Sequence, residues 1–203
     1  MEAAKDEFAQ NGFAGARVDG IARRAGVNKA ALYYHVGDKK TLYARVIQHV
    51  LQGASSRLEH HLVQSRSPEE RILAYVRALA ETFCENPQMP RIVMREMVSG
   101  GQTLPGVFFD GLARIIGMLA DIIDDGRRSG VFGDARAGLV HFMTIGALVI
   151  STTAVPLMRE RCTGDGFSKV FFEPRTVEEL AGEIGNMVLR LLEARGEHGR
   201  RNA

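Results

Sequence analysis

The chain has 203 residues, 45% of them hydrophobic and 25% charged, and a formal net charge of +2 at pH 7, which together exclude a largely disordered chain. Its two cysteines, Cys84 and Cys162, are too few for a disulfide scaffold or a four-cysteine zinc site, and their scarcity suits a reducing compartment. The opening residues contain acids and no long apolar run, so no signal peptide is indicated and we expect a cytoplasmic protein.

The N-terminal part predicts three short helices. Gly12 is expected to end the first helix in a left-handed turn, with Phe13 packed back on Phe8. Gly26 ends the second helix, and Asn28 is a suitable N-cap for a third that runs to about residue 35. The second helix has an apolar stripe at helical spacing, formed by Val18, Ile21, Ala22 and Ala25.

The middle of the chain predicts four further helices. A long fourth helix starts after Asp38, which can act as its N-cap. The fifth starts at Ser67, where Ser-Pro-Glu-Glu combines an N-cap, a first-turn proline and a capping-box glutamate, and it ends near Glu85. A short sixth helix follows over residues 91–98, and an amphipathic seventh helix stops at Gly130.

The 22 residues between Arg136 and Arg159 contain no Lys, Arg, Asp or Glu, a length that can span a bilayer. However, polar residues and Pro156 interrupt this stretch, no second such stretch exists, and no belt of Trp or Tyr flanks it. We therefore favour, over a membrane-spanning segment, an eighth helix capped by Asp134, with one face on the core and the other on a partner subunit. No membrane association is expected.

An irregular connection over residues 159–175 leads to a ninth helix, which Thr176 opens and which runs through Leu192. A polar tail follows from Gly196. No strand-like alternation and no repeat of fixed period is found. The predicted fold class is therefore all-α, with about nine helices.

Residues 18–35 have the spacing of a helix-turn-helix motif, with a tight turn at Ala25-Gly26-Val27. Leu32 is expected to pack with Val27 and Val36 against the preceding helix, so that the second helix of the motif projects its polar side outwards. That side carries Asn28, Lys29, Ala31, Tyr34 and His35. Such a helix fits the DNA major groove, although an ordinary helical hairpin has the same pattern.

The charge distribution supports a polyanionic partner for this segment. Residues 17–45 carry seven basic and two acidic side chains, a net charge of +5, whereas residues 51–203 carry a net charge of −1. Arg17 and Lys39 stand at helix starts, where backbone N–H groups also favour a phosphate. A solvated basic face is the alternative explanation of this charge.

A pattern of fixed spacing runs through residues 12–42, formed by Gly12-Phe13, Val18, Ile21-Ala22, Ala25-Gly26-Val27, Lys29, Leu32-Tyr33, His35, Lys39 and Leu42. This pattern resembles the DNA-binding domain of TetR-family transcriptional regulators. The resemblance implies a helix-turn-helix domain over residues 1–45, a ligand-binding and dimerisation domain over 46–195, and a polar tail over 196–203. It also implies a non-enzymatic repressor that a small, apolar ligand releases from DNA. An activator of the same fold and a helical ligand-binding protein without specific DNA binding are the alternatives.

The resemblance assigns DNA contacts within the motif to Arg17, Asn28, Lys29, Ala31, Tyr33, Tyr34, His35 and Lys39. Lys29 and Ala31 stand where family members approach bases, and Lys39 stands where a lysine usually grips a phosphate. Arg17 departs from the common Ser or Thr, and Ala30 and Ala31 replace a frequent Gly and Thr or Ser. Fewer hydrogen bonds are then available for base readout, so we expect DNA shape to contribute to specificity. Many members also carry a basic arm before the first helix, which this sequence does not show.

The resemblance further implies a homodimer, a pseudo-palindromic double-stranded DNA operator and a small-molecule effector. We expect the eighth and ninth helices of each subunit to form a four-helix bundle at the dimer interface. The candidate ligand-lining residues are apolar with one polar anchor: Met94, Met97, Phe108, Phe109, Leu112, Met118, His141, Phe142 and Met143. For His141, a core or interface histidine bonded to a neighbour is the alternative.

Neither a metal nor a cofactor is expected. His49, His60 and His61 do not have the spacing that places metal ligands on one helix face. Cys84 is expected to be buried as a small apolar residue. The sequence contains no phosphate-binding loop, no GxSxG and no HExxH motif, so an enzyme is not predicted.

Overall fold

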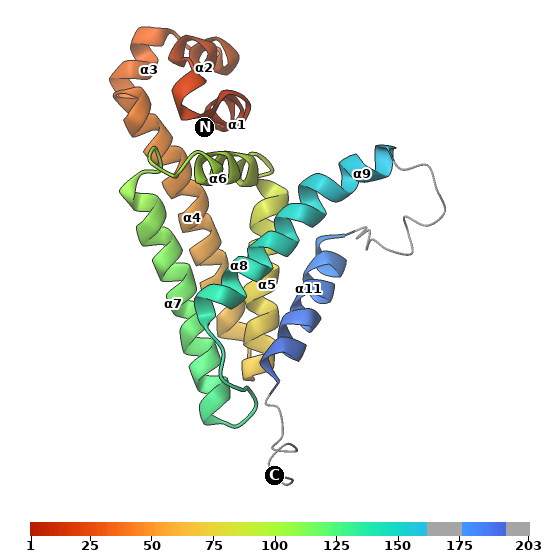
Figure 1. The fold of residues 1–203 in the computed structure, drawn as a ribbon. Coiled ribbons are helices and arrows are strands. Elements are labelled where there is room, and N and C mark those ends of the chain that lie inside the picture. The colour runs from red at the N-terminus through yellow and green to blue at the C-terminus, as the bar shows by residue number, and fades with distance from the viewer. Residues whose placement is uncertain (162–175, 194–203) are drawn as a thin grey trace. The chain divides into compact units, whose positions relative to one another are not determined.

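The computed structural model describes residues 1–161 and 176–193 (Figure 1). Within these two ranges the chain is helical, and it holds no strand beyond one isolated bridge between Phe132 and Glu193. Because α8, η1 and α9 follow one another without a break, the described residues form nine helical segments, and the predicted all-α class is confirmed. The chain divides into two compact units, residues 1–55 with 85–113 and residues 56–84 with those after 113.

The first unit contains the predicted helix-turn-helix. Helix α1 packs against both α2 and α6, and α2 packs against α3. Phe8, Tyr43 and Ile92 are almost fully buried in their shared core, which stabilises helices too short to persist alone in water. The helices of this unit are α1 (Glu2–Gly15), α2 (Val18–Ala25), α3 (Lys29–Val36), α6 (Gln88–Val98) and the first parts of α4 (Lys39–Gln64) and α7 (Gly106–Arg128).

Helix α1 leaves helical geometry at Gly12, where φ is +67°. The positive φ predicted there is present, but ψ is 177°, which is not the conformation of a left-handed cap, and the prediction that the helix ends at this residue is wrong because a further helical turn follows and ends at Gly15. A Cβ atom on residue 12 would lie 3.0 Å from Cδ of Arg95, so both the backbone conformation and the available space favour glycine. Phe8 and Phe13 each pack on the ring of Tyr43, with centroids 4.8 and 5.1 Å away.

The second unit is built around α5 (Pro68–Glu85). Tyr75 of α5 and Leu119 of α7 are fully buried in its core. Helix α11 packs against α8, and it also approaches α5 closely, because a Cβ atom on Gly185 would lie 2.7 Å from Cδ2 of Leu73. The unit further contains α8 (Ala137–Val149), η1 (Ile150–Ala154), α9 (Val155–Arg161), α11 (Val177–Leu192) and the remaining parts of α4 and α7.

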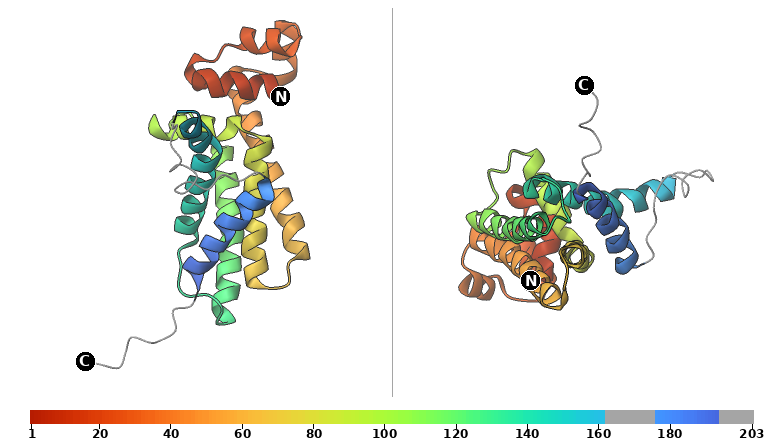
Figure 2. Two further views of the ribbon diagram at one scale, coloured as in Figure 1. Left: turned by 90° about the vertical axis from the view of Figure 1, so that its right-hand side faces the viewer. Right: turned by 90° about the horizontal axis from the view of Figure 1, so that it is seen from below.

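The segments α8, η1 and α9 form one helix of 25 residues, drawn in teal to cyan in Figure 2. Within η1 the helix widens to a π-helical turn, and the hydroxyl groups of Thr152 and Thr153 donate to the carbonyls of Leu148 and Val149. With a mean hydropathy of 1.7, the helix is long and apolar enough to cross a membrane by length and composition alone. Only 28% of the apolar 18-residue stretch within this helix is buried in the chain.

Capping hydrogen bonds confirm four predicted helix starts, at Asn28, Asp38, Ser67 and Thr176. The prediction for Asp134 is wrong. The N–H of Gly133 donates a hydrogen bond to the carbonyl of Leu192, and α8 begins only after Arg136, which is its N-cap residue. Asp134 lies instead 3.9 Å from the guanidinium of Arg127.

The structure differs from two other expectations. Cys84 is exposed in the last turn of α5, so the prediction that it is buried is wrong. The predicted irregular connection starts later than residue 159, because α9 continues to Arg161; its residues 162–175 and the tail from Gly196 lie outside the described residues.

Candidate nucleic-acid interface

Helices α2 and α3 are joined by a tight turn at Gly26. Gly26 has φ +66°, a left-handed conformation that favours glycine, and the next N–H, that of Val27, donates to the carbonyl of Ala22 at 3.0 Å. Asn28 then begins α3, because its Oδ1 accepts from the N–H of Ala30 at 2.7 Å. This is the geometry of a helix-turn-helix unit, in which the second helix presents one side to a partner.

Helix α3 buries none of its residues within the chain. Leu32 and Val36 pack partly against the core, as predicted, whereas Val27 is 45% exposed and does not join them in the interior. The predicted contact residues lie on the open side, where Lys29, Ala31, Tyr33, Tyr34 and His35 are all exposed and Tyr34 is 86% exposed. A helix with this side open is shaped for the major groove.

Lys29 lies in the first turn of α3, and its ammonium group lies 2.6 Å from a carboxylate oxygen of Asp19 on α2. The hydrogen bond and the charge of Asp19 raise the pKa of Lys29 above its ordinary value. The same ammonium lies 5.9 Å from the ring centroid of Tyr33. In the absence of DNA, this candidate base-reading side chain therefore already has an anionic partner within the motif.

Lys39 connects α4 to the end of α1. Its Nζ donates to the carbonyls of Ala14 and Ala16, each at 3.2 Å, and lies 4.8 Å from the ring centroid of Phe13. The Arg45 guanidinium acts similarly at the end of α3, where it donates to the carbonyl of His35 at 2.9 Å. Both basic side chains therefore satisfy carbonyls that the helix ends leave free, and they fix the helices that carry the motif.

Arg17 begins α2, but its backbone N–H is not free for a phosphate as the sequence suggested. It donates to Oε1 of Glu7, a buried carboxylate of α1, at 3.1 Å. Glu7 also lies 3.7 Å from the guanidinium of Arg24. Around these groups the surface forms a polar hollow lined by Glu7, Arg17, Asp19, Gly20, Arg23 and Arg24.

Sequence reasoning missed Glu7, Asp19 and Arg45 as parts of this surface. Each acts on a helix end or a lysine that is ten residues away in the sequence. Such pairs have no periodic signature. The one available signal was that charged residues stand beside predicted helix starts.

The nine candidate ligand-lining residues are divided between the two units. In the first unit Phe108 is buried and Leu112 is half-buried, whereas Met94, Met97 and Phe109 are exposed. In the second unit His141 is buried and Met118 is half-buried, whereas Phe142 and Met143 are exposed. Their assignment to one ligand site stays a prediction.

His141 and Tyr75 form a buried polar pair in the second unit. Nδ1 of His141 and the hydroxyl of Tyr75 are 2.5 Å apart. Burial lowers the pKa of His141 to about 4, so the ring is neutral near pH 7. The neutral imidazole either accepts a hydrogen bond from the phenol or donates one to it, depending on the tautomer. The pair can be purely structural, or it can serve as a polar anchor for a ligand.

Two family models match the chain. The model described as "Bacterial regulatory proteins, tetR family" matches residues 1–46, and the model described as "Tetracyclin repressor-like, C-terminal domain" matches residues 65–153. The first match contains the helix-turn-helix unit and its lysines. The second contains α5, α6, α7 and α8.

The chain is also similar to curated regulators and to solved structures. It is 31% identical to the HTH-type transcriptional regulator RutR of Escherichia coli K12 over 64% of this chain and 61% of that protein, so it spans less than two thirds of this relative. It is 29% identical to the HTH-type transcriptional repressor SCO4008 of Streptomyces coelicolor over 82% of both chains.

Among solved structures, the regulator FadR of Bacillus subtilis, in complex with stearoyl-CoA, superposes with a TM-score of 0.69 at 18% identity over 95% of both chains, which shows a shared fold. The two family models together match residues 1–46 and 65–153, which are 135 of the 203 residues. The chain therefore belongs to the TetR family of bacterial regulatory proteins.

Proposed function

We propose that this protein is a sequence-specific DNA-binding transcriptional repressor, which acts as a homodimer and which a small, apolar ligand releases from its operator. The observation that carries the proposal is α3, a recognition helix with a good N-cap, no buried residue and a basic surrounding segment. The match to the family's N-terminal model over residues 1–46 and the likeness to the repressor SCO4008 support it.

In this proposal the N-terminal part of α3 enters the major groove. Lys29, Ala31 and Tyr34 lie against base edges, and Asn28 caps the helix and contacts DNA as well. Tyr33 and His35 meet phosphates or thymine methyl groups. Arg17 and Lys39 hold the phosphate backbone through their side chains, since a lysine that donates to two carbonyls keeps a third proton for a phosphate oxygen.

The dimer forms through the helix Ala137–Arg161 and α11, which correspond to the eighth and ninth predicted helices. Large apolar side chains stand exposed at helical spacing on both: Leu139, Phe142, Met143, Ile150 and Leu157 on the first, Met187 and Leu191 on the second. Packing these faces against the same faces of a second copy gives a four-helix bundle and removes them from water. The operator is then a pseudo-palindrome with half-site centres about 34–36 Å apart.

The effector is a small apolar molecule, and His141, which is buried beside Tyr75 in the second unit, is the candidate polar anchor for it. Stearoyl-CoA bound to FadR of the same fold supports a ligand with an apolar part. Helix α4 belongs to both units and can carry a ligand-induced shift to α3. A tenfold loss of DNA affinity requires a ligand preference of only about 1.4 kcal/mol for the unbound conformation.

In this proposal residues 1–45 bind DNA, and residues 46–195 bind the ligand and the second subunit. The protein acts in the cytoplasm and needs neither enzymatic activity nor a membrane. The apolar helix Ala137–Arg161 is explained by the subunit interface.

DNA selection with the purified full chain, followed by fluorescence anisotropy of the enriched site across a salt series, tests the proposal. We expect enrichment of a pseudo-palindrome and a steep linear fall of log K with log salt, because phosphate contacts release counterions. Weak binding without any enriched sequence would overturn the proposal. A protein that dissolves only in detergent would overturn its soluble dimeric form.

A further inference from the structure

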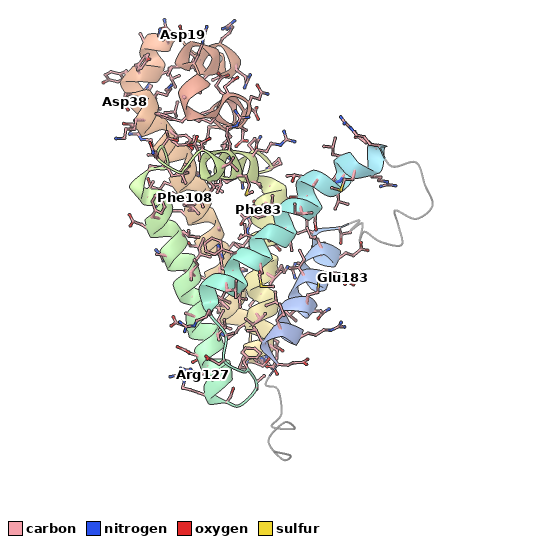
Figure 3. The ribbon with its side chains drawn as sticks, in the orientation of Figure 1. Asp19, Asp38, Phe83, Phe108, Arg127 and Glu183 are labelled. Carbon is pink, nitrogen blue, oxygen red and sulfur yellow. The ribbon has the colours of Figure 1, made fainter. Side chains whose placement is uncertain are left out.

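The ion pair between Asp19 and Lys29 lies on the surface that would face DNA. Asp19, labelled in Figure 3, stands in the first turn of α2, and Lys29 stands in the first turn of α3. Their charged atoms are 2.6 Å apart, while the side chains are 61% and 53% exposed. The pair is therefore well formed, and more than half of each side chain is accessible to a partner.

The other acid of this surface is already engaged. Glu7 is buried, accepts from the N–H of Arg17 and pairs with Arg24. Asp19, by contrast, lines the same hollow beside the arginines and reaches across to Lys29. The ammonium of Lys29 is directed back towards α2 and the ring of Tyr33. Asp19 is thus the group that sets where this lysine points before DNA arrives.

We propose that Asp19 is a specificity-determining residue that acts through Lys29: it neutralises the lysine in an internal ion pair, which reduces the attraction of Lys29 to non-specific phosphates, and it orients the ammonium so that the remaining protons reach a base edge of the operator. This inference rests on the proposed DNA-binding function. The carboxylate of Asp19 cancels the charge of Lys29 and repels a nearby phosphate, whereas a neutral guanine edge accepts hydrogen bonds from the ammonium while the ion pair stays in place.

The energetics of exposed ion pairs fit this role of Asp19. An accessible Lys–Asp pair contributes little stability, so a phosphate can break it without disturbing the fold. A lysine that leaves a carboxylate to meet a phosphate also leaves behind an anion, which recruits a cation from solution. Lys29 therefore contributes little to the counterion release on non-specific DNA as long as Asp19 is present.

Asp19→Asn in the full chain tests this. At about 0.1 M salt we expect non-specific DNA to bind about fivefold more tightly, and the operator less than about twofold more tightly, so the specificity ratio falls. The slope of log K against log salt on non-specific DNA should steepen by about 0.9 per subunit. Asp19→Glu keeps the charge and should behave as the parent does.

A double-mutant cycle separates the effect through Lys29 from simple removal of a negative charge. In a Lys29→Gln background, Asp19→Asn should tighten non-specific binding by less than about twofold, because no lysine is left to release. Glu2→Gln is the matched control: Glu2 is also exposed and also paired with a lysine, Lys5, at 2.7 Å, and its loss should leave the specificity ratio unchanged.

The outcomes are distinct. Equal tightening with and without Lys29, or an unchanged specificity ratio in Asp19→Asn, would overturn the inference while leaving the DNA-binding function in place. Failure of the parent protein itself to prefer any DNA sequence would overturn the proposed function, and the inference with it. Circular dichroism of each variant establishes that the helices are intact before either conclusion is drawn.

Discussion

Two surfaces of the described chain are open to solvent, and they differ in chemistry. Helix α3 presents lysine, tyrosine and histidine and buries none of its residues. The helix Ala137–Arg161 and α11 present aliphatic, aromatic and methionine side chains instead, among them Leu139, Phe142, Ile150, Met187 and Leu191. The surface of α3 is polar and belongs to a basic segment of the chain. The surface formed by the other two helices is apolar.

The difference indicates two kinds of partner. A polar, charged surface is stable in water and binds a polyanion reversibly, with an affinity that salt controls. An extended apolar surface is rarely left open on a soluble protein, so its partner stays bound. In the proposed function, the first surface binds DNA and the second binds another copy of the chain.

Leu191→Glu should have the largest effect, because it places a charge in the apolar surface. We expect monomers in analytical ultracentrifugation, and a loss of operator affinity of about 100-fold, since the two half-sites are no longer held by one particle. Val63→Glu is the matched control, because Val63 is 87% exposed on α4 and lies outside the apolar surface. A Leu191→Glu protein that stays dimeric would show that the interface lies elsewhere.

Acid should lower the free energy of unfolding through His141, which is buried on α8. The pKa of His141 is lowered to about 4 by burial, whereas in the unfolded chain it is about 6.5. Between these values the unfolded chain binds a proton that the folded chain does not. The stability present above pH 6.5 is therefore lost as the pH falls towards 4, by up to about 3 kcal/mol.

Denaturant unfolding at several pH values between 7.5 and 4 measures this loss. His141→Gln should show a shallower pH dependence in that window, and the exposed His49→Gln should match the parent protein. An identical pH profile for His141→Gln and the parent would contradict the burial argument.

Lys39→Ala should act on both the fold and DNA binding. Loss of its two carbonyl contacts should lower the free energy of unfolding by about 1 kcal/mol. Loss of its phosphate contact should weaken binding to every DNA sequence and reduce the salt slope by about 1 per subunit. Lys40→Ala, at the exposed neighbouring position, should leave stability unchanged. An unaltered salt slope would remove Lys39 from the phosphate contacts.

Tyr34→Ala should have the smallest effect. Because the side chain is 86% exposed, thermal stability should not change, but specific affinity should fall about fivefold as an aromatic contact to DNA is lost. Tyr34→Phe separates the ring from the hydroxyl and should retain most of the affinity if the ring makes the contact. Operator affinity unaffected by Tyr34→Ala would place α3 differently in the groove.

Local signals in the sequence predicted the order of helices and most of their starts. Asn28, Ser67 and Thr176 cap helices because a side-chain oxygen needs only the N–H two or three residues ahead. The bonds from Lys39 to α1, from Arg17 to Glu7 and from Lys29 to Asp19 depend on how the helices pack, and spacing along the chain does not encode them.

The candidate ligand site shows the same limit. Met94 and Met97 stand three residues apart on α6, a spacing that is the same whether the stripe faces a cavity or water. The structure leaves both exposed. Apolar periodicity therefore located the helix face, and the packing of the other helices decided what that face meets.

The π-helical turn at Ile150–Ala154 has a consequence for how this protein can diverge from its relatives. A π turn is equivalent to an α-helix that has accepted one additional residue. Deletion of one residue here would restore regular winding, whereas a deletion elsewhere in the helix would rotate everything after it by about 100°. Single-residue gaps between relatives should therefore gather at this turn, where an insertion is absorbed locally and both flanking segments keep their faces.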